Sequence, residues 1–515
     1  MKKIFGILHA EKLNIKNIII ERVKKSMYYV ENRKYPSPFV SLLPIVVLII
    51  LLFFTIRLFG ADALGGGSQI CLLVTTALCA GIGMVGYHIP WKDIEHAIVN
   101  NIAGVSTALI ILLIIGALSA AWMLSGVVPT LIYYGVQVIH PKFFLVSCCI
   151  ICAVVSVMTG SSWTTIATIG IALLGIGKAQ GFEEGWIAGA IISGAYFGDK
   201  ISPLSDTTVL ASSVTDTPLF THIRYMIFTT VPSMLITLAI FTTVGFMNSS
   251  ELGTDAVLFT DGLAERFHIS LWLLIVPVIT GILIARKVPS IVTLFISTAL
   301  AVICMLCFQT DVLLEIAGTV QNRGEALYRA TLTSLFSATQ LTASSPELSE
   351  LIATRGMGGM MDTIWLILCA MCLGGAMTAC GMLGSITSVF VRLTRRLVGM
   401  IASTVGAGLF LNLATADQYI SIILTGNMFK EIYRKNGYES RLLSRTTEDA
   451  VTVTSVLIPW NTCGMTQATI LSVPTLTYLP YCFFNLLSPL MSILVASLGY
   501  KIYRIGTDVS EKKNV

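Results

Sequence analysis

The sequence has few charged residues. Lys, Arg, Asp and Glu together make up only 12% of its 515 residues, and histidine occurs six times. Soluble domains carry about 25% charged residues, whereas here hydrophobic residues reach 55% and the mean hydropathy is +0.82. This composition excludes an ordinary soluble domain and indicates an all-α integral membrane protein that crosses the lipid bilayer several times.

Patterns that carry enzymatic or cofactor chemistry are also missing. Residues 160–164 depart from the G-x-S-x-G nucleophile elbow because Thr164 stands in place of the second glycine. The glycines at 65–67 follow no strand, so they form a loop rather than a phosphate-binding turn. No aromatic–basic module for nucleic acid is present. We therefore expect no enzyme activity, no cofactor and no nucleic-acid partner.

The first 38 residues are basic. They hold nine Lys or Arg residues against three Glu, and the tail at 501–515 is also rich in Lys and Arg. The positive-inside rule therefore predicts that both ends lie in the cytoplasm. The long apolar run begins only near Phe39, which argues against a secretory signal. Residues 14–30 are a candidate amphipathic helix at the membrane surface.

One stretch of the chain interrupts the apolar pattern with charges, hydroxyls and a proline. It runs from Gly198 to Thr208 and reads GDKISPLSDTT. An ionisable group at bilayer depth costs about 2.5–3.5 kcal/mol on insertion scales, so it is retained mainly where it functions. Pro203 is expected to break the helix, and an exposed backbone at this depth is tolerated where it lines a polar cavity. The stretch therefore predicts an ion site.

A second set of interruptions follows 256 residues later. Thr-Gly-Ser-Ser-Trp at 159–163 aligns with Thr-Ala-Asp-Gln-Tyr at 415–419, and Pro-Leu-Ser-Asp at 203–206 aligns with Pro-Trp-Asn-Thr at 459–462. Half-length apolar runs flank the first member of each half, which predicts re-entrant hairpins. Paired interruptions of this kind mark the binding sites of secondary transporters. If each half crosses the membrane an odd number of times, the halves insert as inverted repeats and the four interruptions meet near mid-membrane.

This duplication divides the chain into parts. We expect a cytoplasmic basic segment at 1–38, a first repeat at 39–247, a polar linker at 248–268, a second repeat at 269–500 and a cytoplasmic tail at 501–515. Polar connections are expected at 88–101 and, as a charged loop, at 430–435.

Asp206 is the first candidate for the ion chemistry. A carboxylate in a low-dielectric site holds either a proton or a sodium ion, but hardly both, and that competition is the minimum requirement for exchange. The alternative is that Asp206 caps the helix that resumes after Pro203. Asp417 is the second candidate carboxylate, with a helix N-cap as its alternative role.

Neutral oxygens surround these two acids in the sequence. They belong to Ser161, Ser162, Ser205, Thr207, Asn461 and Thr462. Hard cations prefer such ligands together with freed backbone carbonyls, so Asp206 and Asn461 are candidate sodium ligands. Each of these side chains is individually as well explained by capping or by contacts between helices.

Three further acids are less clearly placed by the sequence. Asp199 precedes Lys200, which fits either an internal ion pair that steadies the broken helix or a direct role in transport. Glu448 and Asp449 come nearly three helical turns before Pro459, either at membrane depth or near its interface.

Five motifs carry a resemblance to a known family. They read SGAYFGDKISPLSDTT at 193–208, LFTHIR at 219–224, ADQY at 416–419, SRTTED at 444–449 and IPWNTCG at 458–464. With these motifs the sequence resembles the NhaC family of bacterial sodium/proton antiporters, which includes sodium-linked malate/lactate antiporters. The resemblance implies a cytoplasmic-membrane protein of the ion-transporter superfamily. It implies two inverted repeats, each split into scaffold and transport elements that move as an elevator, and a possible homodimer. It also supports site roles for Asp206, Ser205, Asn461 and Thr462.

Departures from the family pattern leave the transported solute open. Val209 stands where the family tends to have Asn, and Thr425-Gly426-Asn427 replaces Pro-Gly-Arg. The leading hypothesis is Na⁺/H⁺ antiport, with Na⁺ and H⁺ as the transported ions. The alternative is Na⁺- or H⁺-coupled transport or exchange of a small organic solute, such as malate/lactate or an amino acid.

Overall fold

The computed structural model describes residues 36–59, 65–247, 254–286, 288–320, 322–392 and 396–505. The candidate amphipathic helix at 14–30 lies outside this part of the chain. Within it nearly all regular structure is helical, apart from two isolated β-bridges, Thr339 with Thr354 and Tyr438 with Arg504.

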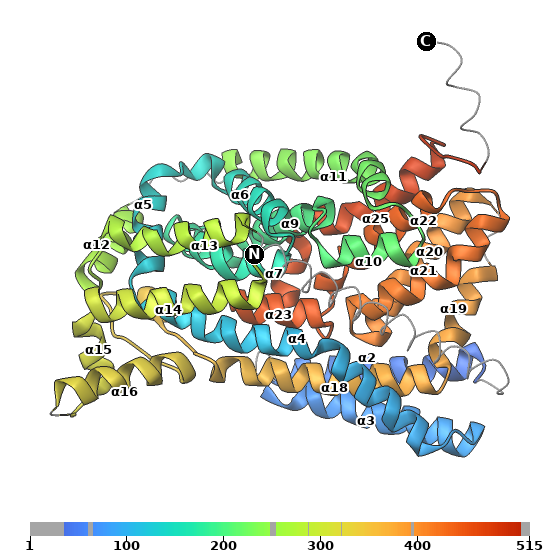
Figure 1. The fold of residues 1–515 in the computed structure, drawn as a ribbon, viewed down its shortest axis with the longest axis horizontal. Helices are drawn as coiled ribbons and strands as arrows, with labels where there is room; N and C mark the ends of the chain where they lie inside the picture. Colours follow the sequence, from blue (N-terminus) through green and yellow to red (C-terminus); the bar gives the residue numbers. More distant parts are fainter. Residues whose placement is uncertain are drawn as a thin grey trace, which may run out of the picture.

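The described part of the first half of the chain forms three long helices, α2, α4 and α11, of 22, 34 and 29 residues, and a series of shorter helices (Figure 1). In order these are α2 (Pro38–Phe59), α3 (Gly67–Gly81), η2 (Ile82–Gly86), α4 (Trp91–Leu124), α5 (Val127–Val138), η3 (Pro141–Phe143), α6 (Phe144–Thr159), α7 (Ser162–Thr165), η4 (Ile166–Gly170), α8 (Ile171–Ala179), α9 (Glu184–Ile201), α10 (Asp206–Val214) and α11 (Leu219–Met247).

The second half continues the helical pattern. Its elements are α12 (Thr254–Arg266), η5 (Leu271–Leu274), α13 (Ile275–Ala285), α14 (Ser290–Phe308), α15 (Thr310–Ala317), α16 (Arg323–Phe336), α17 (Pro346–Ile352), η6 (Gly358–Met360), α18 (Met361–Ala379), α19 (Met382–Arg392), α20 (Leu397–Thr415), α21 (Gln418–Lys435), α22 (Ser440–Thr447), η7 (Glu448–Thr452), η8 (Ser455–Leu457), α23 (Thr462–Leu471), α24 (Thr475–Tyr478), η9 (Leu479–Tyr481) and α25 (Phe483–Ser497).

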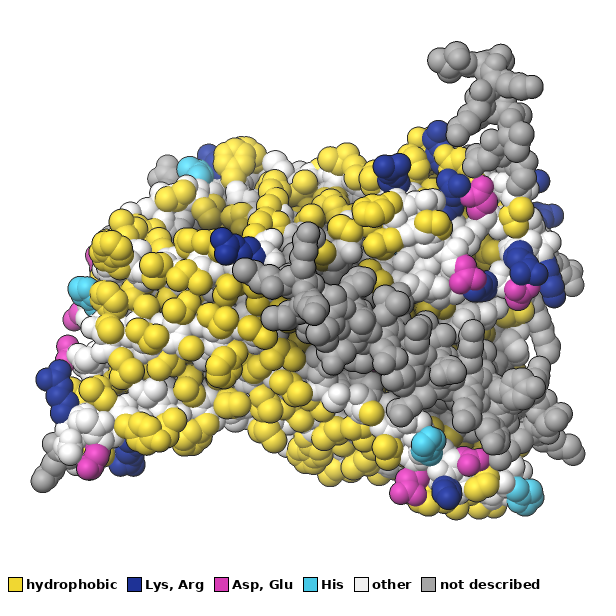
Figure 2. Space-filling view, viewed as in Figure 1, with side chains coloured by type: hydrophobic (Ala, Val, Ile, Leu, Met, Phe, Trp, Pro, Cys, Tyr) yellow, Lys and Arg dark blue, Asp and Glu magenta, His cyan; other side chains and the backbone are white. Residues whose placement is uncertain are grey.

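The outer surface is suited to lipid. Among the described residues, nine helices are long and apolar enough to cross a membrane, or up to eleven if each of two bent helix pairs is one span. Figure 2 shows hydrophobic side chains over the middle of one face, with most Lys, Arg, Asp and Glu residues at its left and right margins. That distribution matches an apolar belt between two aqueous surfaces, and the prediction of a multi-pass membrane protein is confirmed.

The two halves interleave rather than lying apart. Helix α18 packs against both α3 and α4, and α19 packs against α2, so segments from opposite halves of the chain form one layer (Figure 1). A second region contains α6 packed along α9, together with α11 and α25. This second region carries the sequence interruptions around which the candidate site is built.

Two expected connections are helical. Helix α4 begins at Trp91, so most of the predicted polar connection at 88–101 is its first three turns. Ile94 is fully buried there, and no Gly or Pro interrupts residues 91–101, which explains the continuation. The charged loop predicted at 430–435 is the end of α21, where Lys430 pairs with Asp216. Helix α12 occupies much of the predicted linker.

The predicted re-entrant hairpins stay predictions. The segments that flank the first interruption have 19 and 18 residues, each about the length needed to cross the bilayer. The segments that flank the second interruption also have 19 and 18 residues.

Candidate ion-binding site

The two interruptions at 159–163 and 415–419, called the first and second tip, have the same local structure. Gly160 (φ 64°) and Ala416 (φ 57°) both adopt the left-handed conformation. The threonine before each accepts a hydrogen bond from the N–H two residues later, at 3.0 and 3.2 Å. Ser161 and Asp417 then cap the next helix by accepting from the N–H three residues on, at 3.2 and 3.0 Å. The sequence alignment of the tips is therefore also a structural one.

The two proline-containing breaks also correspond. The first, at 202–205, separates α9 from α10, and the second, at 458–461, precedes α23. Ser205 caps α10 by accepting from the N–H of Thr208 at 3.4 Å, and Asn461 caps α23 by accepting from the N–H of Cys463 at 3.1 Å. The alternative role of Asp206 as the cap is wrong, because Ser205 performs it and Asp206 is the first residue of α10.

Asp199 connects the first tip to the first broken helix. Its side chain is buried, and Oδ2 accepts hydrogen bonds from the N–H of Ser162 at 3.0 Å and from its Oγ at 2.7 Å. In the second half the equivalent pair is Ser455, which donates to Gln418 at 3.3 Å. Both halves therefore have a side-chain hydrogen bond between the tip and the segment that leads to the break. Only in the first half does this bond involve a carboxylate, that of Asp199.

Asp417 both caps α21 and faces the second break. While Oδ1 accepts from the backbone of α21, Oδ2 accepts from the Thr462 hydroxyl at 3.3 Å, and the Thr462 N–H donates to the carbonyl of Ala416 at 2.8 Å. Asp417 and Thr462 are each 2% exposed. The predicted alternative for Asp417, an N-cap, is confirmed, and its second oxygen is held against a hydroxyl.

Asp206 is the acid whose carboxylate is free. It is exposed, and its side chain makes no hydrogen bond or ion pair with the described residues. Tyr419, which is 37% exposed, lies within electrostatic range of Asp206, Asp199 and Asp417. The three acids therefore share one neighbourhood, in which Asp206 is exposed and Asp199 and Asp417 are buried.

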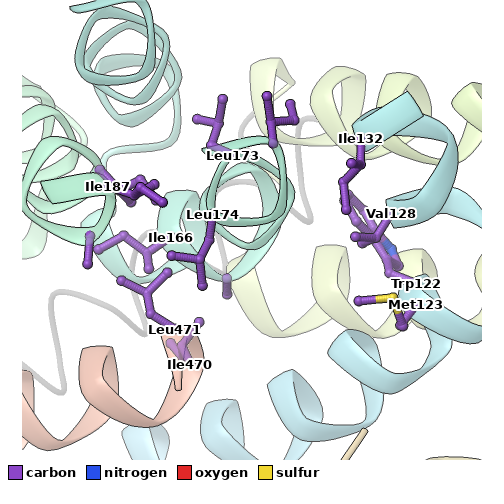
Figure 3. Close-up of a cluster of buried hydrophobic side chains, with 14 of the residues drawn as sticks. Trp122, Met123, Val128, Ile132, Ile166, Leu173, Leu174, Ile187, Ile470 and Leu471 are labelled. Carbon is purple, nitrogen blue, oxygen red and sulfur yellow. The ribbon is translucent and has the colours of Figure 1, made fainter. Parts of the chain in front are cut away.

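Elements of both halves meet at this neighbourhood. Helix α10 packs against α21, where the Gly426 position approaches Val214 so closely that a Cβ would lie 2.6 Å from its Cγ1. Helix α23 packs against η4, and Figure 3 shows Ile166 of η4 beside Ile470 and Leu471 of α23. The segment that follows the tip of one half therefore lies against the helix that follows the break of the other half.

Three of the predicted ligands, Asn461, Ser205 and Thr207, form hydrogen bonds within the protein. The Asn461 amide donates to the carbonyl of Asn412 at 3.1 Å, and the hydroxyls of Ser205 and Thr207 lie 2.9 Å apart. In the described part of the chain, no three His, Cys, Asp or Glu side chains come close enough to hold a metal ion together. Sodium ligation by Asp206 with Asn461 stays a prediction.

The structure corrects the predicted ion pair of Lys200 and shows the surroundings of Glu448 and Asp449. Lys200 does form an internal ion pair, but with Asp449 of the other half rather than with Asp199. Glu448 and Asp449 are both fully buried within the protein, and whether they lie at membrane depth or near its interface stays a prediction. Arg445, also fully buried, was missed. Its only signal was a basic residue one helical turn before two acids.

Sequence comparisons place the chain among known proteins. The profile of the Na⁺/H⁺ antiporter family matches residues 194–500. The Na⁺/H⁺ antiporter NhaC of Alkalihalophilus pseudofirmus is 36% identical over 430 residues, which are 83% of this chain and 89% of that protein. The chain belongs to the Na⁺/H⁺ antiporter (NhaC) family. It is therefore a secondary transporter and not an enzyme.

Other relatives of this NhaC-family protein have names that specify organic solutes. The malate-2H⁺/Na⁺-lactate antiporter of Bacillus subtilis is 36% identical, with coverage of 84% of this chain and 90% of that one. The arginine/ornithine antiporter ArcD of Halobacterium salinarum is 33% identical, with coverage of 94% and 97%. The family resemblance seen in the motifs is thereby confirmed, and it spans ion and organic-solute antiporters.

Proposed function

We propose that this NhaC-family protein exchanges Na⁺ for H⁺ at the site formed by Asp206, Asp199 and Asp417. The observation that carries the proposal is the free carboxylate of Asp206 beside two buried acids, where interrupted elements of both halves meet. A carboxylate in that position attracts either a proton or a monovalent cation.

The surrounding oxygens suit a partly dehydrated sodium ion. Asp199 and Asp417 are each held by hydroxyl groups, those of Ser162 and Thr462, at 2.7 and 3.3 Å. Such oxygens, together with backbone carbonyls at the breaks, are the ligands that hard cations prefer. In the proposed cycle, Na⁺ that enters past Asp206 competes with H⁺ for the site, and departure of the ion leaves the site free to bind H⁺.

The same geometry supports inverted repeats that move as an elevator. The matched tips and breaks are what two repeats of one ancestral unit would retain. The layer formed by α3, α4 and α18 contacts the tip region through α23, and it is the candidate scaffold. The homodimer implied by the family resemblance stays a prediction.

The second candidate function is coupled transport or exchange of a small organic solute. It is favoured by relatives at 33–36% identity whose names specify malate/lactate or arginine/ornithine exchange. In that case, tip hydroxyls and N–H groups would hold the solute, while Asp206 would keep the role of cation site.

A transport assay in liposomes distinguishes the two candidate functions. Purified protein is reconstituted with a trapped pH-sensitive dye, an acid-inside gradient is imposed, and Na⁺ is added outside without organic solute. Na⁺/H⁺ exchange predicts that Na⁺ dissipates the gradient and that choline does not. A response that requires malate, lactate, arginine or ornithine would instead support the second candidate.

A further inference from the structure

A second group of charged side chains lies near the candidate cation site. Lys200, Arg445, Glu448 and Asp449 are all 0% exposed. Asp449 pairs with Lys200, and its Oδ1 accepts from the hydroxyls of Ser488 at 3.0 Å and Thr229 at 3.2 Å, while its Oδ2 has no hydrogen-bond partner among the described residues. The guanidinium of Arg445 stacks over the Tyr225 ring at 4.7 Å and lies 3.9 Å from Oδ2 of Asp449.

Polar atoms without a hydrogen-bond partner also occur on Arg445 and on Oδ2 of Asp449, but among the four described side chains Glu448 is the one that forms no ion pair. Neither of its carboxylate oxygens has a hydrogen-bond partner in the part of the chain that the structure describes, and no cation lies within ion-pair distance of it. An ionised carboxylate without a partner in a protein interior is too costly to persist, and such a group is neutralised instead. A proton, unlike a bound metal ion, can neutralise Glu448 without any free space beside the carboxylate. Glu448 is therefore expected to be a protonated carboxylic acid in this arrangement.

The local backbone also marks this position. Glu448–Thr452 forms a single π-helical turn between α22 and the second break. Such turns are uncommon and are found frequently at functional sites. The first tip is followed by a π-helical turn of the same length, Ile166–Gly170. Glu448 thus lies on an irregular turn close to the elements that form the cation site.

Several charged groups face Glu448. Lys200 and Asp199 come from α9, Asp449 lies beside it, and Arg445 precedes it by three residues on α22. Of the other elements packed against this turn, α20 and α25 carry no charged residue, α10 carries Asp206, and α21 contributes the buried phenol of Tyr433. On loss of the Glu448 proton, Arg445 and Lys200 are the cations placed to offset the new charge.

We propose that Glu448 is a second proton site, which takes up and releases its own proton during the transport cycle. The proposal rests on the proposed Na⁺/H⁺ exchange. Glu448 is connected to the proposed cation site through few residues. Its neighbour Asp449 pairs with Lys200, which follows Asp199 in the chain. When Glu448 gives its proton to water, the added negative charge favours a cation at Asp199. When Glu448 regains a proton, that support is removed.

The transport test uses Glu448→Gln, which keeps the shape of the protonated acid and cannot titrate. Proteoliposomes report H⁺ movement with a trapped dye and Na⁺ movement with ²²Na⁺. We expect Glu448→Gln to carry one proton fewer per Na⁺ than the unchanged protein, and the pH dependence of Na⁺ uptake to flatten. Glu431→Gln, at an exposed position of α21, is the matched control and should leave both unchanged. An unaltered H⁺/Na⁺ ratio in Glu448→Gln would overturn the proposal.

An infrared spectrum tests the protonated acid without transport. The unchanged protein should show a carbonyl band of a protonated carboxyl group that is absent from Glu448→Gln and present in Glu431→Gln. If Glu448→Gln does not fold, Glu448→Asp replaces it, and the band should shift. A band unaffected by either substitution contradicts the proposal. If the unchanged protein moves no H⁺ with Na⁺, the proposed function fails, and the infrared band still reports on Glu448.

Discussion

At the scale of single residues, the acids of the site differ in what holds them. Asp199 and Asp417 are buried and hydrogen-bonded to the tips or breaks, whereas the Asp206 carboxylate is exposed and unpaired. A hydrogen bond to a charged group contributes about 1.5–3 kcal/mol. The two buried acids are thus fixed in place, and Asp206 is the acid left free to take part in the proposed exchange of a proton for a cation.

Replacing Asp206 removes that exchangeable group. We expect Asp206→Asn to reduce Na⁺-dependent proton movement in liposomes by at least about tenfold, since a factor of ten corresponds to about 1.4 kcal/mol. Because the side chain has no partner, the protein should still insert and purify normally. The control is Asp216→Asn, an exposed acid whose partner is Lys430. Full exchange activity in Asp206→Asn would remove this residue from the mechanism.

At this scale the sequence could single out acids where a charge interrupts an apolar run, and their roles in transport stay predictions. Asp206, Asp417 and Asp199 stand out for this reason, and the structure places all three in one neighbourhood. The sequence did not identify Arg445 as buried or Lys200 as the partner of Asp449. Depth and cross-chain pairing depend on packing between segments some 249 residues apart, which no local pattern records.

At the scale of elements, each tip depends on one residue in the left-handed conformation. A glycine takes that conformation at the first tip, and Ala416 takes it at the second at φ 57°. A Cβ on Gly160 would lie 2.6 Å from the carbonyl carbon of Leu204, so the first tip also needs glycine for space. The two tips share a backbone but differ in their tolerance of a side chain.

This difference gives a paired prediction. Gly160→Ala should lower the thermal unfolding temperature and impair exchange, because a left-handed alanine costs about 1–2 kcal/mol and the overlap with Leu204 adds to it. Ala416→Gly should change stability by no more than about 1 kcal/mol, since relief of strain offsets the greater freedom of glycine. The prediction is tested by measuring the thermal unfolding of both variants in detergent and their exchange activity in liposomes. Equal stability of Gly160→Ala and the unchanged protein would contradict this account of the tip.

The positions of the helix breaks could be predicted from the sequence, whereas several helix boundaries could not. Pro203 predicted the end of α9, which indeed ends at Ile201. The polar residues after Trp91 suggested a connection, yet they form the start of α4, because helix propensity and the burial of Ile94 outweigh their polarity.

At the scale of the whole molecule, the duplication was visible in the sequence and its packing was not. The offset of 256 residues predicted matched tips and breaks, and their hydrogen bonds correspond in the structure. The insertion of α18 between α3 and α4 could not be read from the sequence, because every one of these apolar helices offers a similar surface. The fully buried pair of Lys200 and Asp449 further joins the two halves.

The account depends on competition between Na⁺ and H⁺ for the same carboxylates. The most direct measurement is proton release by purified protein in detergent, in weak buffer with a pH indicator, when Na⁺ is added. We predict that Na⁺ releases protons in proportion to the Na⁺ bound and that choline releases none. Release should fade at alkaline pH, where the carboxylates are already deprotonated. Binding of Na⁺ without any release of protons at neutral pH would contradict the account.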